Sequence, residues 1–473
     1  MIVITKKDVA WNFIATFLKT ASSIILLPLI LKCLSAQEIG IWTIFISIGG
    51  LASIADFGFS PSFSRNITFI FSGVNKLSKV GFNNESNTGV INYVLLKTAL
   101  KAMKYFYSRV AIFVFLFLSI FGTYYIKYVL KDYQGSNDSI YLAWLIFICY
   151  ISFNMYTIYF ESLLIGKGSI KESKQIDIIA QIIYLCLATI LLLLGYGLVG
   201  FFGAQLFSSI LTRYFSQKKF YTAELKEKLK NSHVDDYKDI IRTIFPNAIK
   251  GGISSMGSLF IYRSPLLIGS MFLSLQDIGS YGLTRQIFDV IYLVASTYSI
   301  TYFSKLSSNW AINDINANRI IYVKSLLVTF FLYLLAIPAL VFVANPFLTL
   351  YGSNTLLLEG LPLYVLIAHY FFNLFHGQSI PIVVSRNHLP LYYVGFIGGV
   401  IVIILTFVML KYFSFGVLAL VISPTVVYMA YENWKWPSYA FKVLELNFKT
   451  FLDINKLVIS NFYRSLKFKL TSV

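Results

Sequence analysis

Apolar residues along this chain come in runs of about twenty, the length that a helix needs to cross a hydrocarbon core of about 30 Å. Short polar clusters separate these runs. A spanning segment of this kind must be helical, because its lipid-exposed backbone has to satisfy its own hydrogen bonds. The short alternating segments typical of outer-membrane barrels do not fit the pattern. The sequence therefore predicts an all-α, polytopic membrane protein.

The runs predict about twelve spanning helices, divided evenly between the two halves of the chain. The first half has its spans at 9–31, 39–58, 106–128, 140–165, 177–194 and 198–215. The second half has them at 243–273, 278–303, 320–343, 356–384, 389–410 and 416–434. Four parts follow: an N-terminal lobe (1–215), a basic connection (216–242), a C-terminal lobe (243–434) and a basic amphipathic tail (435–473).

The first run also has features of a signal peptide, because Lys6 and Lys7 precede its apolar residues. However, the run is longer than the apolar region of a signal peptide, and no small-residue cleavage site comes before Glu38. We therefore expect this segment to be retained as the first spanning helix.

The connections between the runs differ in their content of lysine and arginine. Alternate connections carry nearly all of these residues: Lys76, Lys79, Lys97, Lys101, Lys104, Lys167, Lys171, Lys174, Arg213, Lys218, Lys219, Lys226, Lys228, Lys230, Lys238, Arg242, Lys305, Arg319, Lys324 and Arg386. The opposite connections hold only Lys32, Lys127, Lys131 and Lys411. Cytoplasmic loops are enriched in Lys and Arg, so the basic connections and both termini are expected in the cytoplasm.

The net charge of +18 comes with only 13% charged residues, whereas a soluble domain carries about 25%. A basic soluble protein would suggest a nucleic-acid partner. Here the positive charge lies along one membrane face. Anionic membrane lipids are therefore the expected partners, and no nucleic-acid partner is expected. In the tail, Lys442, Lys449 and Lys456 recur every seven residues. On one helical face they would suit a helix on the inner membrane surface, and a solvated tail is the alternative.

Two similar segments occupy corresponding places in the two halves. Pro-Leu-Ile-Leu at 28–31 precedes Leu-Ser-Ala-Gln-Glu-Ile-Gly at 34–40, and Pro-Leu-Leu-Ile at 265–268 precedes Leu-Ser-Leu-Gln-Asp-Ile-Gly at 273–279. Both motifs fall in an outer turn after the first helix of a half. Because both halves begin inside, they form two parallel six-helix repeats. Transporters built from repeats bind substrate between them and expose it alternately to each side.

Four basic residues are expected at membrane depth and are the candidate substrate-binding residues: Lys19, Lys250, Arg263 and Arg285. Lys19 lies about 15 Å into the first helix, near the midplane. Ionisable residues at such depth usually face a cavity or a partner, and Arg and Lys suit an anionic group. Snorkelling of Lys250 and Arg263, and a structural ion pair between Arg285 and Asp289, are the alternatives.

Three acidic residues are the candidates for ion coupling: Asp289, Asp56 and Glu161. Asp289 is the deepest, whereas Asp56 and Glu161 lie nearer the inner surface, where solvation also explains them. We hypothesise that substrate phosphate and Asp289 compete for Arg285. His369 and His376 share a helix face, where polar packing is favoured over a proton relay.

Several short motifs lie near the N-terminus: Trp11-Asn12, the segment 28–31, Ile39-Gly40-Ile41-Trp42, Asp56-Phe57-Gly58-Phe59 and Ser64-Arg65-Asn66. Together they resemble the O-antigen flippase (Wzx-type) family, the polysaccharide transporters of the multidrug/oligosaccharidyl-lipid/polysaccharide exporter superfamily. The resemblance in length and hydropathy extends over the whole chain.

The resemblance implies a flippase that moves an undecaprenyl-pyrophosphate-linked oligosaccharide, the O-antigen repeat unit of lipopolysaccharide, across a bacterial inner membrane. It also implies two six-helix lobes around a central cavity that opens to each side in turn. Coupling to an ion gradient is implied as well, with a polysaccharide polymerase and a chain-length regulator as partners. A pyrophosphate carries about two negative charges, which cannot cross hydrocarbon unaided. Basic residues in a cavity would replace the lost hydration.

Other functions fit the sequence less well. It contains no G-x-x-x-x-G-K-[ST] phosphate loop for ATP hydrolysis. A membrane-bound polysaccharide polymerase would need a substantial outer loop, and the outer connections are short. A multidrug or cation antiporter of the same superfamily favours an acidic cavity. Cys33, Cys149 and Cys186 lack metal-ligand spacing, so no metal or cofactor is expected.

Overall fold

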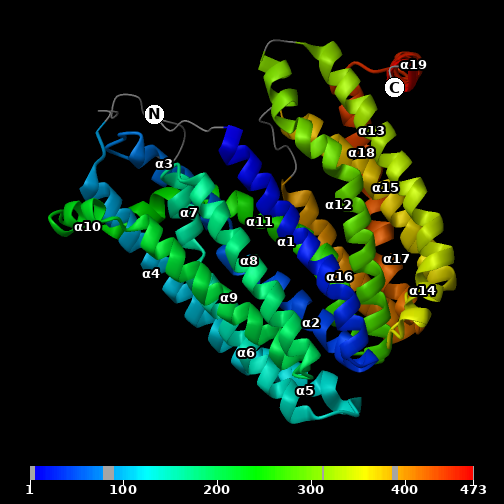
Figure 1. Ribbon diagram of the computed structural model, residues 1–473, viewed down its shortest axis with the longest axis horizontal. Coiled ribbons are helices and arrows are strands. Elements are labelled where there is room, and N and C mark those ends of the chain that lie inside the picture. Colours follow the sequence, from blue (N-terminus) through cyan, green and yellow to red (C-terminus); the bar gives the residue numbers. More distant parts are fainter. Residues whose placement is uncertain (1–5, 78–89, 312–313, 386–391, 472–473) are drawn as a thin grey trace. The chain divides into compact units, whose positions relative to one another are not determined.

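The computed structural model describes residues 6–77, 90–311, 314–385 and 392–471 of the chain. Its regular elements are helices (Figure 1), which confirms the all-α prediction. Lys79 and Arg386, two of the basic residues predicted in inner connections, lie outside the described residues.

Contacts within the chain define two compact units. The first consists of Met1–Gly279 with Ser353–Thr355, and the second of Ser280–Gly352 with Leu356–Val473. The first unit therefore includes α11 (Tyr237–Gly269) and the first turn of α12 (Leu275–Ala311). The predicted division into lobes at 1–215 and 243–434 stays a prediction.

The first unit is a bundle of long helices with short ones at its ends (Figure 1). Its elements before α11 are α1 (Lys6–Cys33), α2 (Ala36–Ala52), α3 (Phe59–Phe71), α4 (Tyr93–Phe117), α5 (Thr123–Val129), α6 (Asn137–Thr157), α7 (Tyr159–Gly166), α8 (Ile170–Leu193), α9 (Gly197–Phe220) and α10 (Ala223–Lys230). Neighbouring helices pack in the order α1, α8, α9, α6 and α4. Helix α11 packs against α2, α3 and α4.

Aromatic side chains fill the core between α2, α6 and α9. The Phe45 ring centroid lies 5.0 Å from that of Trp144, 5.2 Å from Phe147 and 5.3 Å from Phe202. All four side chains are buried. Tilted and edge-on rings at this separation are the favoured arrangement of aromatic pairs, so these residues hold the three helices together.

Helix α4 begins well before the membrane span predicted at 106–128. Its first residue is Tyr93, and the Asn92 side chain accepts a hydrogen bond from the Leu95 backbone nitrogen at 3.0 Å. This cap satisfies one of the free amides at the helix start. Lys97, Lys101 and Lys104, predicted in a loop, are therefore on a helix. The prediction was wrong there because apolar runs define the part of a helix inside lipid, not where its backbone hydrogen bonds end.

In its described residues, the second unit contains the rest of α12 and seven further α-helices. They are α13 (Ile315–Pro338), α14 (Ala344–Tyr351), α15 (Gly360–Val384), α16 (Tyr392–Phe413), α17 (Val417–Val427), α18 (Asn433–Val443) and α19 (Phe448–Thr471). A π-helical turn, Tyr428–Glu432, joins α17 to α18. Helix α15 packs against α13, α17 and α18 and is the centre of this unit.

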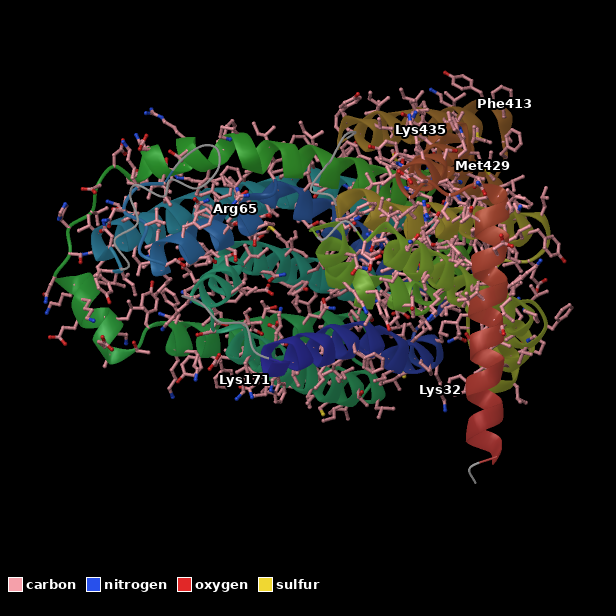
Figure 2. All side chains as sticks on the ribbon, turned by 90° about the horizontal axis from the view of Figure 1, so that it is seen from above. Lys32, Arg65, Lys171, Phe413, Met429 and Lys435 are labelled. Carbon is pink, nitrogen blue, oxygen red and sulfur yellow. The ribbon has the colours of Figure 1, made fainter. Side chains whose placement is uncertain are left out.

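The C-terminal tail is two helices rather than one. Helix α18 ends at Val443, and Arg319 from α13 donates hydrogen bonds to the backbone oxygens of Leu444, at 2.6 Å, and Glu445, at 3.2 Å. Helix α19 starts anew and runs crosswise to the long helices of its unit (Figure 2). Lys442 therefore belongs to α18, and the predicted helical face shared with Lys449 and Lys456 is wrong.

The twelve predicted spans each overlap a helix of the structure. Within the described residues, six helical segments are long and apolar enough to cross a membrane by length and composition: Ala36–Asp56, Tyr93–Asp132, Asn137–Gly166, Ile170–Leu193, Ile315–Tyr351 and Tyr393–Phe413. Helices α12 and α15 carry polar side chains inside their unit and are not among these six. The count of twelve and the six-helix repeats stay predictions.

The two similar seven-residue segments have the same local structure. Ser35 caps α2, and its side chain accepts a hydrogen bond from the Glu38 backbone nitrogen at 3.2 Å. Ser274 accepts one from the Asp277 nitrogen at 3.1 Å, where α12 begins. Each acidic side chain bonds back to its serine residue, to the Ser35 nitrogen and to the Ser274 hydroxyl. This reciprocal cap explains why a serine and an acid stand three residues apart in both segments.

The two segments also pack on each other within the first unit. A Cβ atom added to Gly40 would lie 2.1 Å from the carbonyl oxygen of Leu275, and one added to Gly279 would lie 3.1 Å from that of Ala36. Gly40 and Gly279 are the last residues of the two segments, and Ala36 and Leu275 the third. The last residue of each segment, a glycine, thus packs against the third residue of the other segment. This close contact requires that neither glycine position carries a side chain.

Candidate functional site

Arg285 and Asp289 on α12 begin a polar cluster inside the second unit. Arg285 is buried, with 8% of its surface exposed, whereas Asp289 is exposed. The Tyr370 hydroxyl on α15 donates a hydrogen bond to Asp289 Oδ1 at 2.5 Å, and the Tyr370 ring stacks on Phe288 at 4.8 Å. The ion pairs among described residues do not include one between Arg285 and Asp289. Asp289 is thus bonded to a tyrosine from another helix.

Two histidines of α15 continue this cluster. His369 and His376 are both buried, and the ring of Tyr428 lies 5.8 Å from the first and 5.6 Å from the second. His369 lies close enough to Arg285 for an electrostatic interaction, and its Nδ1 is 3.2 Å from the Thr425 hydroxyl. The histidines are therefore linked through side chains of α12, α17 and the π-helical turn.

Glu432 is the acidic member of the cluster that sequence reasoning missed. Its Oε2 lies 3.5 Å from His376 Nε2, and only 14% of its side chain is exposed. The Trp436 indole donates a hydrogen bond to the same carboxylate. On the opposite side of the ring, His376 Nδ1 lies 3.3 Å from the Asn373 amide oxygen. A buried histidine and a mostly buried carboxylate at this distance form a pair that can exchange and hold a proton.

The sequence contained part of the signal for Glu432. The residue lies two positions before the predicted end of the last span, at Trp434, where a charged side chain is easily assigned to the interface. In the structure it ends the π-helical turn 428–432, whose extra residue rotates Tyr428 and Glu432 relative to a regular helix. Turns of this kind are frequent at functional sites. Hydrophobic periodicity gives no sign of such a turn.

Asp56 belongs to the first unit and ends the 3-10 turn Ser53–Asp56, just before α3. Its carboxylate accepts hydrogen bonds from the Ser60 backbone nitrogen, at 3.1 Å, and from the Tyr107 hydroxyl, at 2.6 Å. Phe57 and Gly58, which connect Asp56 to α3, have positive φ angles of 48° and 74°. The carboxylate therefore fastens the tight turn before α3 to α4, which is a structural use of the charge.

Glu161 lies in α7 and is also paired. Lys174 Nζ of α8 lies 2.7 Å from Glu161 Oε1 and 3.1 Å from Asp177 Oδ2. This ion triad links α7 to α8 within the first unit. Asp56 and Glu161 belong to the first unit and the α15 cluster to the second, and the predicted part of these two residues in ion coupling stays a prediction.

The remaining predicted cations all belong to the first unit. Arg263 lies on α11 against α2, since a Cβ atom on Gly50 would meet its Nε at 3.0 Å. Lys19 lies on α1 and Lys250 on α11, and their side chains are outside the described residues. Their predicted role in substrate binding is not tested by this geometry.

Several solved structures have this fold. An inward-facing multidrug resistance MATE family transporter of the MOP superfamily aligns with a TM-score of 0.61 at 12% identity, over 91% of this chain and 94% of that one. The lipid II flippase MurJ, in an inward closed conformation, aligns with a TM-score of 0.59 at 16% identity, over 97% and 93%. An outward-facing MATE transporter aligns with a TM-score of 0.54 at 11% identity, over 93% and 96%.

The comparisons by sequence give no match, neither with a family model nor with a curated protein. At these identities the structural likeness concerns the fold. The chain thus has the fold of the MOP superfamily transporters and the apolar helices of a multi-pass membrane protein.

Proposed function

We propose that this protein is a flippase that moves an anionic lipid-linked oligosaccharide across the membrane by alternating access. In the form that the N-terminal motifs imply, the cargo is an undecaprenyl-pyrophosphate-linked O-antigen repeat unit in a bacterial inner membrane. The fold supports a transporter of this kind, because one structure that shares it over 97% of this chain is a lipid II flippase.

The observation that carries the proposal is Arg285, a guanidinium group 8% exposed among the helices of the second unit. A buried cation costs free energy of solvation, and such residues in membrane helices mark pathways for charged substrates. The fork of five donors on one guanidinium can hold a structural partner and a phosphate oxygen at the same time. His369 beside it adds a second group that can donate to an anion.

The pair of His376 and Glu432 supports a proton gradient as the energy source. Binding of a proton raises the net charge of this pair, whose histidine lies on α15 and whose carboxylate lies in the π-helical turn. Such a change in a buried polar network shifts the balance between conformations. In this scheme Asp289, which accepts a hydrogen bond from Tyr370 instead of pairing with Arg285, supports the site from its exposed side.

The proposal is tested by complementation of a flippase-deficient bacterium that expresses the matching sugar cluster. We expect the wild-type chain to restore surface polysaccharide. Lipid-linked repeats that stay on the inner leaflet, despite correct insertion of the chain, would contradict the proposed cargo. The assay also separates the second candidate, since a drug exporter would leave polysaccharide unchanged and raise drug resistance.

That second candidate is a multidrug or cation antiporter, in keeping with the MATE transporters that share the fold. Asp289 is the observation in its favour, because an exposed carboxylate beside the Tyr370 ring suits an organic cation. The anionic cargo is preferred because the neighbouring Arg285 would repel a cation.

Substitution of Glu432 by glutamine is expected to abolish the stimulation of transport by an inward proton gradient. Glutamine keeps the size of the side chain and an acceptor for the Trp436 indole, but it cannot bind and release a proton. The measurement is flipping by purified protein in liposomes, with and without the gradient. Glu227→Gln, on the exposed face of α10, is the matched control. Undiminished stimulation in the Glu432 variant would exclude this pair as the coupling site.

A further inference from the structure

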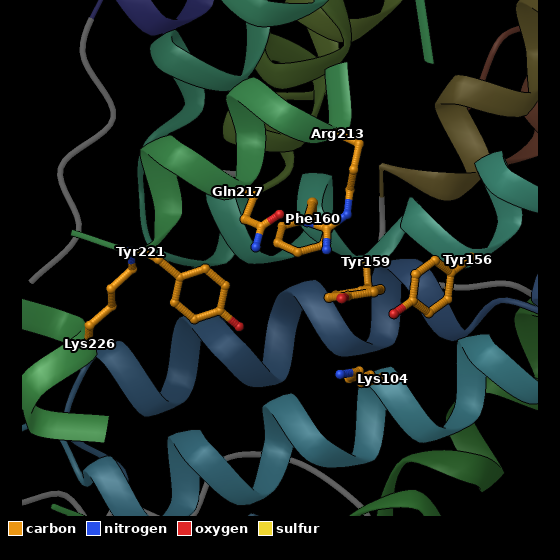
Figure 3. A pocket seen from close by; sticks show the side chains of 8 residues that line it. All are labelled: Lys104, Tyr156, Tyr159, Phe160, Arg213, Gln217, Tyr221 and Lys226. Carbon is orange, nitrogen blue, oxygen red and sulfur yellow. The ribbon is translucent and has the colours of Figure 1, made fainter. Parts of the chain in front are cut away.

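A cavity in the first unit contains a set of residues that the proposed function does not use. It has a volume of about 350 Å³ and is lined by Lys104, Tyr156, Tyr159, Phe160, Arg213, Gln217, Tyr221 and Lys226. These side chains come from α4, α6, α7, α9, α10 and the residues that join α9 to α10 (Figure 3). The volume lies in the range of about 300–1,000 Å³ that is usual for small-molecule sites.

The cavity is positively charged. Lys104, Arg213 and Lys226 contribute three cations, and no carboxylate is among the lining residues of this described region. The groups that act electrostatically on Arg213 are the hydroxyls of Tyr156, Tyr159 and Tyr221. Three cations without a carboxylate give a potential that favours an anion.

Arg213 is placed for an anion by its packing. Its guanidinium carbon lies 3.4 Å from the centroid of the Phe160 ring, so the planar group is stacked on an aromatic wall. Its Nη1 atom is enclosed and has no hydrogen-bond partner among the described residues. A buried donor without an acceptor is costly, and a stacked guanidinium keeps its edge free for bidentate contact with phosphate.

The walls add a surface for a ring or a polyol. Tyr159 and Phe160 are nearly fully buried, and the Arg213 guanidinium covers the Phe160 ring. Tyr156 and Tyr221 are partly exposed and offer their rings and hydroxyls to a ligand. In Figure 3, Lys104 lies below the tyrosine rings of the cavity, Lys226 lies to the left of these rings, and Arg213 lies above them. Gln217, one helical turn after Arg213, supplies both a donor and an acceptor. Aromatic faces and amide groups together suit a hydroxyl-bearing ring.

We propose that this cavity binds a phosphate ester that carries a small polyol or sugar, with the phosphate on Arg213 and the attached group against Tyr156 and Tyr221. Such a ligand can be the headgroup of a membrane lipid or a soluble sugar phosphate. The site lies on predicted inner-side residues, and none of its lining residues belongs to the cluster around Arg285. Its existence does not depend on the proposed cargo.

The test uses purified full-length protein in lipid nanodiscs. In discs of neutral phosphatidylcholine, the binding of glucose 1-phosphate and of glucose is measured by calorimetry. In discs that contain phosphatidylglycerol, native mass spectrometry measures the lipid that stays bound. Binding of glucose 1-phosphate but not of glucose identifies a soluble ligand, and selective retention of phosphatidylglycerol identifies a lipid headgroup.

The variants decide which residues are responsible. Arg213→Gln is expected to weaken whichever ligand binds by about tenfold or more. Arg109→Gln is the matched control, because Arg109 also lies over an aromatic ring, that of Tyr105, but outside the cavity. Lys104 is exposed, and its replacement by glutamine leaves the stacking of Arg213 on Phe160 intact. Lys104→Gln should therefore weaken binding by a smaller factor. If neither probe binds to the wild type, or if the Arg109 and Arg213 variants weaken binding equally, the proposal is wrong.

Discussion

Substitution of Arg285 by alanine is expected to reduce transport by about 30-fold or more while the protein still inserts and folds. Removing one partner from a buried, hydrogen-bonded contact between charges costs about 2–5 kcal/mol. Each 1.4 kcal/mol corresponds to about a tenfold change in an equilibrium constant. The measurement is restored surface polysaccharide in the flippase-deficient strain, together with the rate of flipping in liposomes at equal protein content.

Two further variants separate substrate binding from general damage. Lys305→Ala removes an exposed cation from the same helix and is expected to leave transport unchanged. Arg285→Lys keeps the charge but loses the bidentate geometry, so it should retain an intermediate activity. Normal transport by the alanine variant would rule out Arg285 as a substrate contact. Equal losses in the alanine and lysine variants, with lowered thermal stability, would indicate a structural role.

Gly40→Ala is the substitution expected to have the largest effect on conformation. Its new methyl group would lie 2.1 Å from the Leu275 carbonyl oxygen, so the two seven-residue segments have to separate. Overpacking of this kind costs about 1–3 kcal/mol. A change of that size alters the population of the state with the segments in contact by about 5- to 150-fold. If this contact closes the outer side of the transporter, transport should also fall.

The effect is measured with a single reporter cysteine at Ala36, in a background where Cys33, Cys149 and Cys186 are serine. Labelling by a membrane-impermeant thiol reagent should be faster in the Gly40→Ala protein. Gly279→Ala, with its nearest atom at 3.1 Å, should act in the same direction but more weakly. Gly203→Ala in α9 is the control, because nothing lies within 4 Å of its added Cβ atom. Equal labelling rates in the Gly40, Gly279 and Gly203 variants would show that the contact between the two seven-residue segments is not tight.

Both predictions depend on information that the sequence holds only in part. Arg285 was recognisable as a cation within a predicted span, because one charged residue stands out among apolar ones. The Leu-Ser-x-Gln-acid-Ile-Gly pattern predicted two equivalent turns, and the reciprocal serine–acid caps at Ser35 and Ser274 explain the shared residues. The pattern could not show that the two turns touch, because contact between distant segments leaves no mark in local periodicity.

The partners of the charged residues were beyond prediction for a similar reason. The spacing of Arg285 and Asp289 suggested a pair on one helix face, whereas the hydroxyl of Tyr370, from another helix, bonds to Asp289. Asp56 and Glu161 were candidates for ion coupling, and the structure gives them Tyr107 and Lys174 as partners. Which polar group meets which depends on how helices pack and rotate, and hydropathy is insensitive to both.

The sequence by itself determined that this chain is an all-helical, multi-pass membrane protein, because twenty-residue apolar runs have no other stable form in lipid. Each predicted span overlaps a helix, but α3 lies outside all of them, and helices such as α4 and α12 extend well beyond their spans. Only the tertiary structure decided which polar residues share a site. His369, His376 and Glu432 come together through the packing of α15 on the π-helical turn, and Arg213 meets Phe160 through the packing of α9 on α7. Such contacts depend on the three-dimensional positions of whole helices, which no local stretch of sequence encodes.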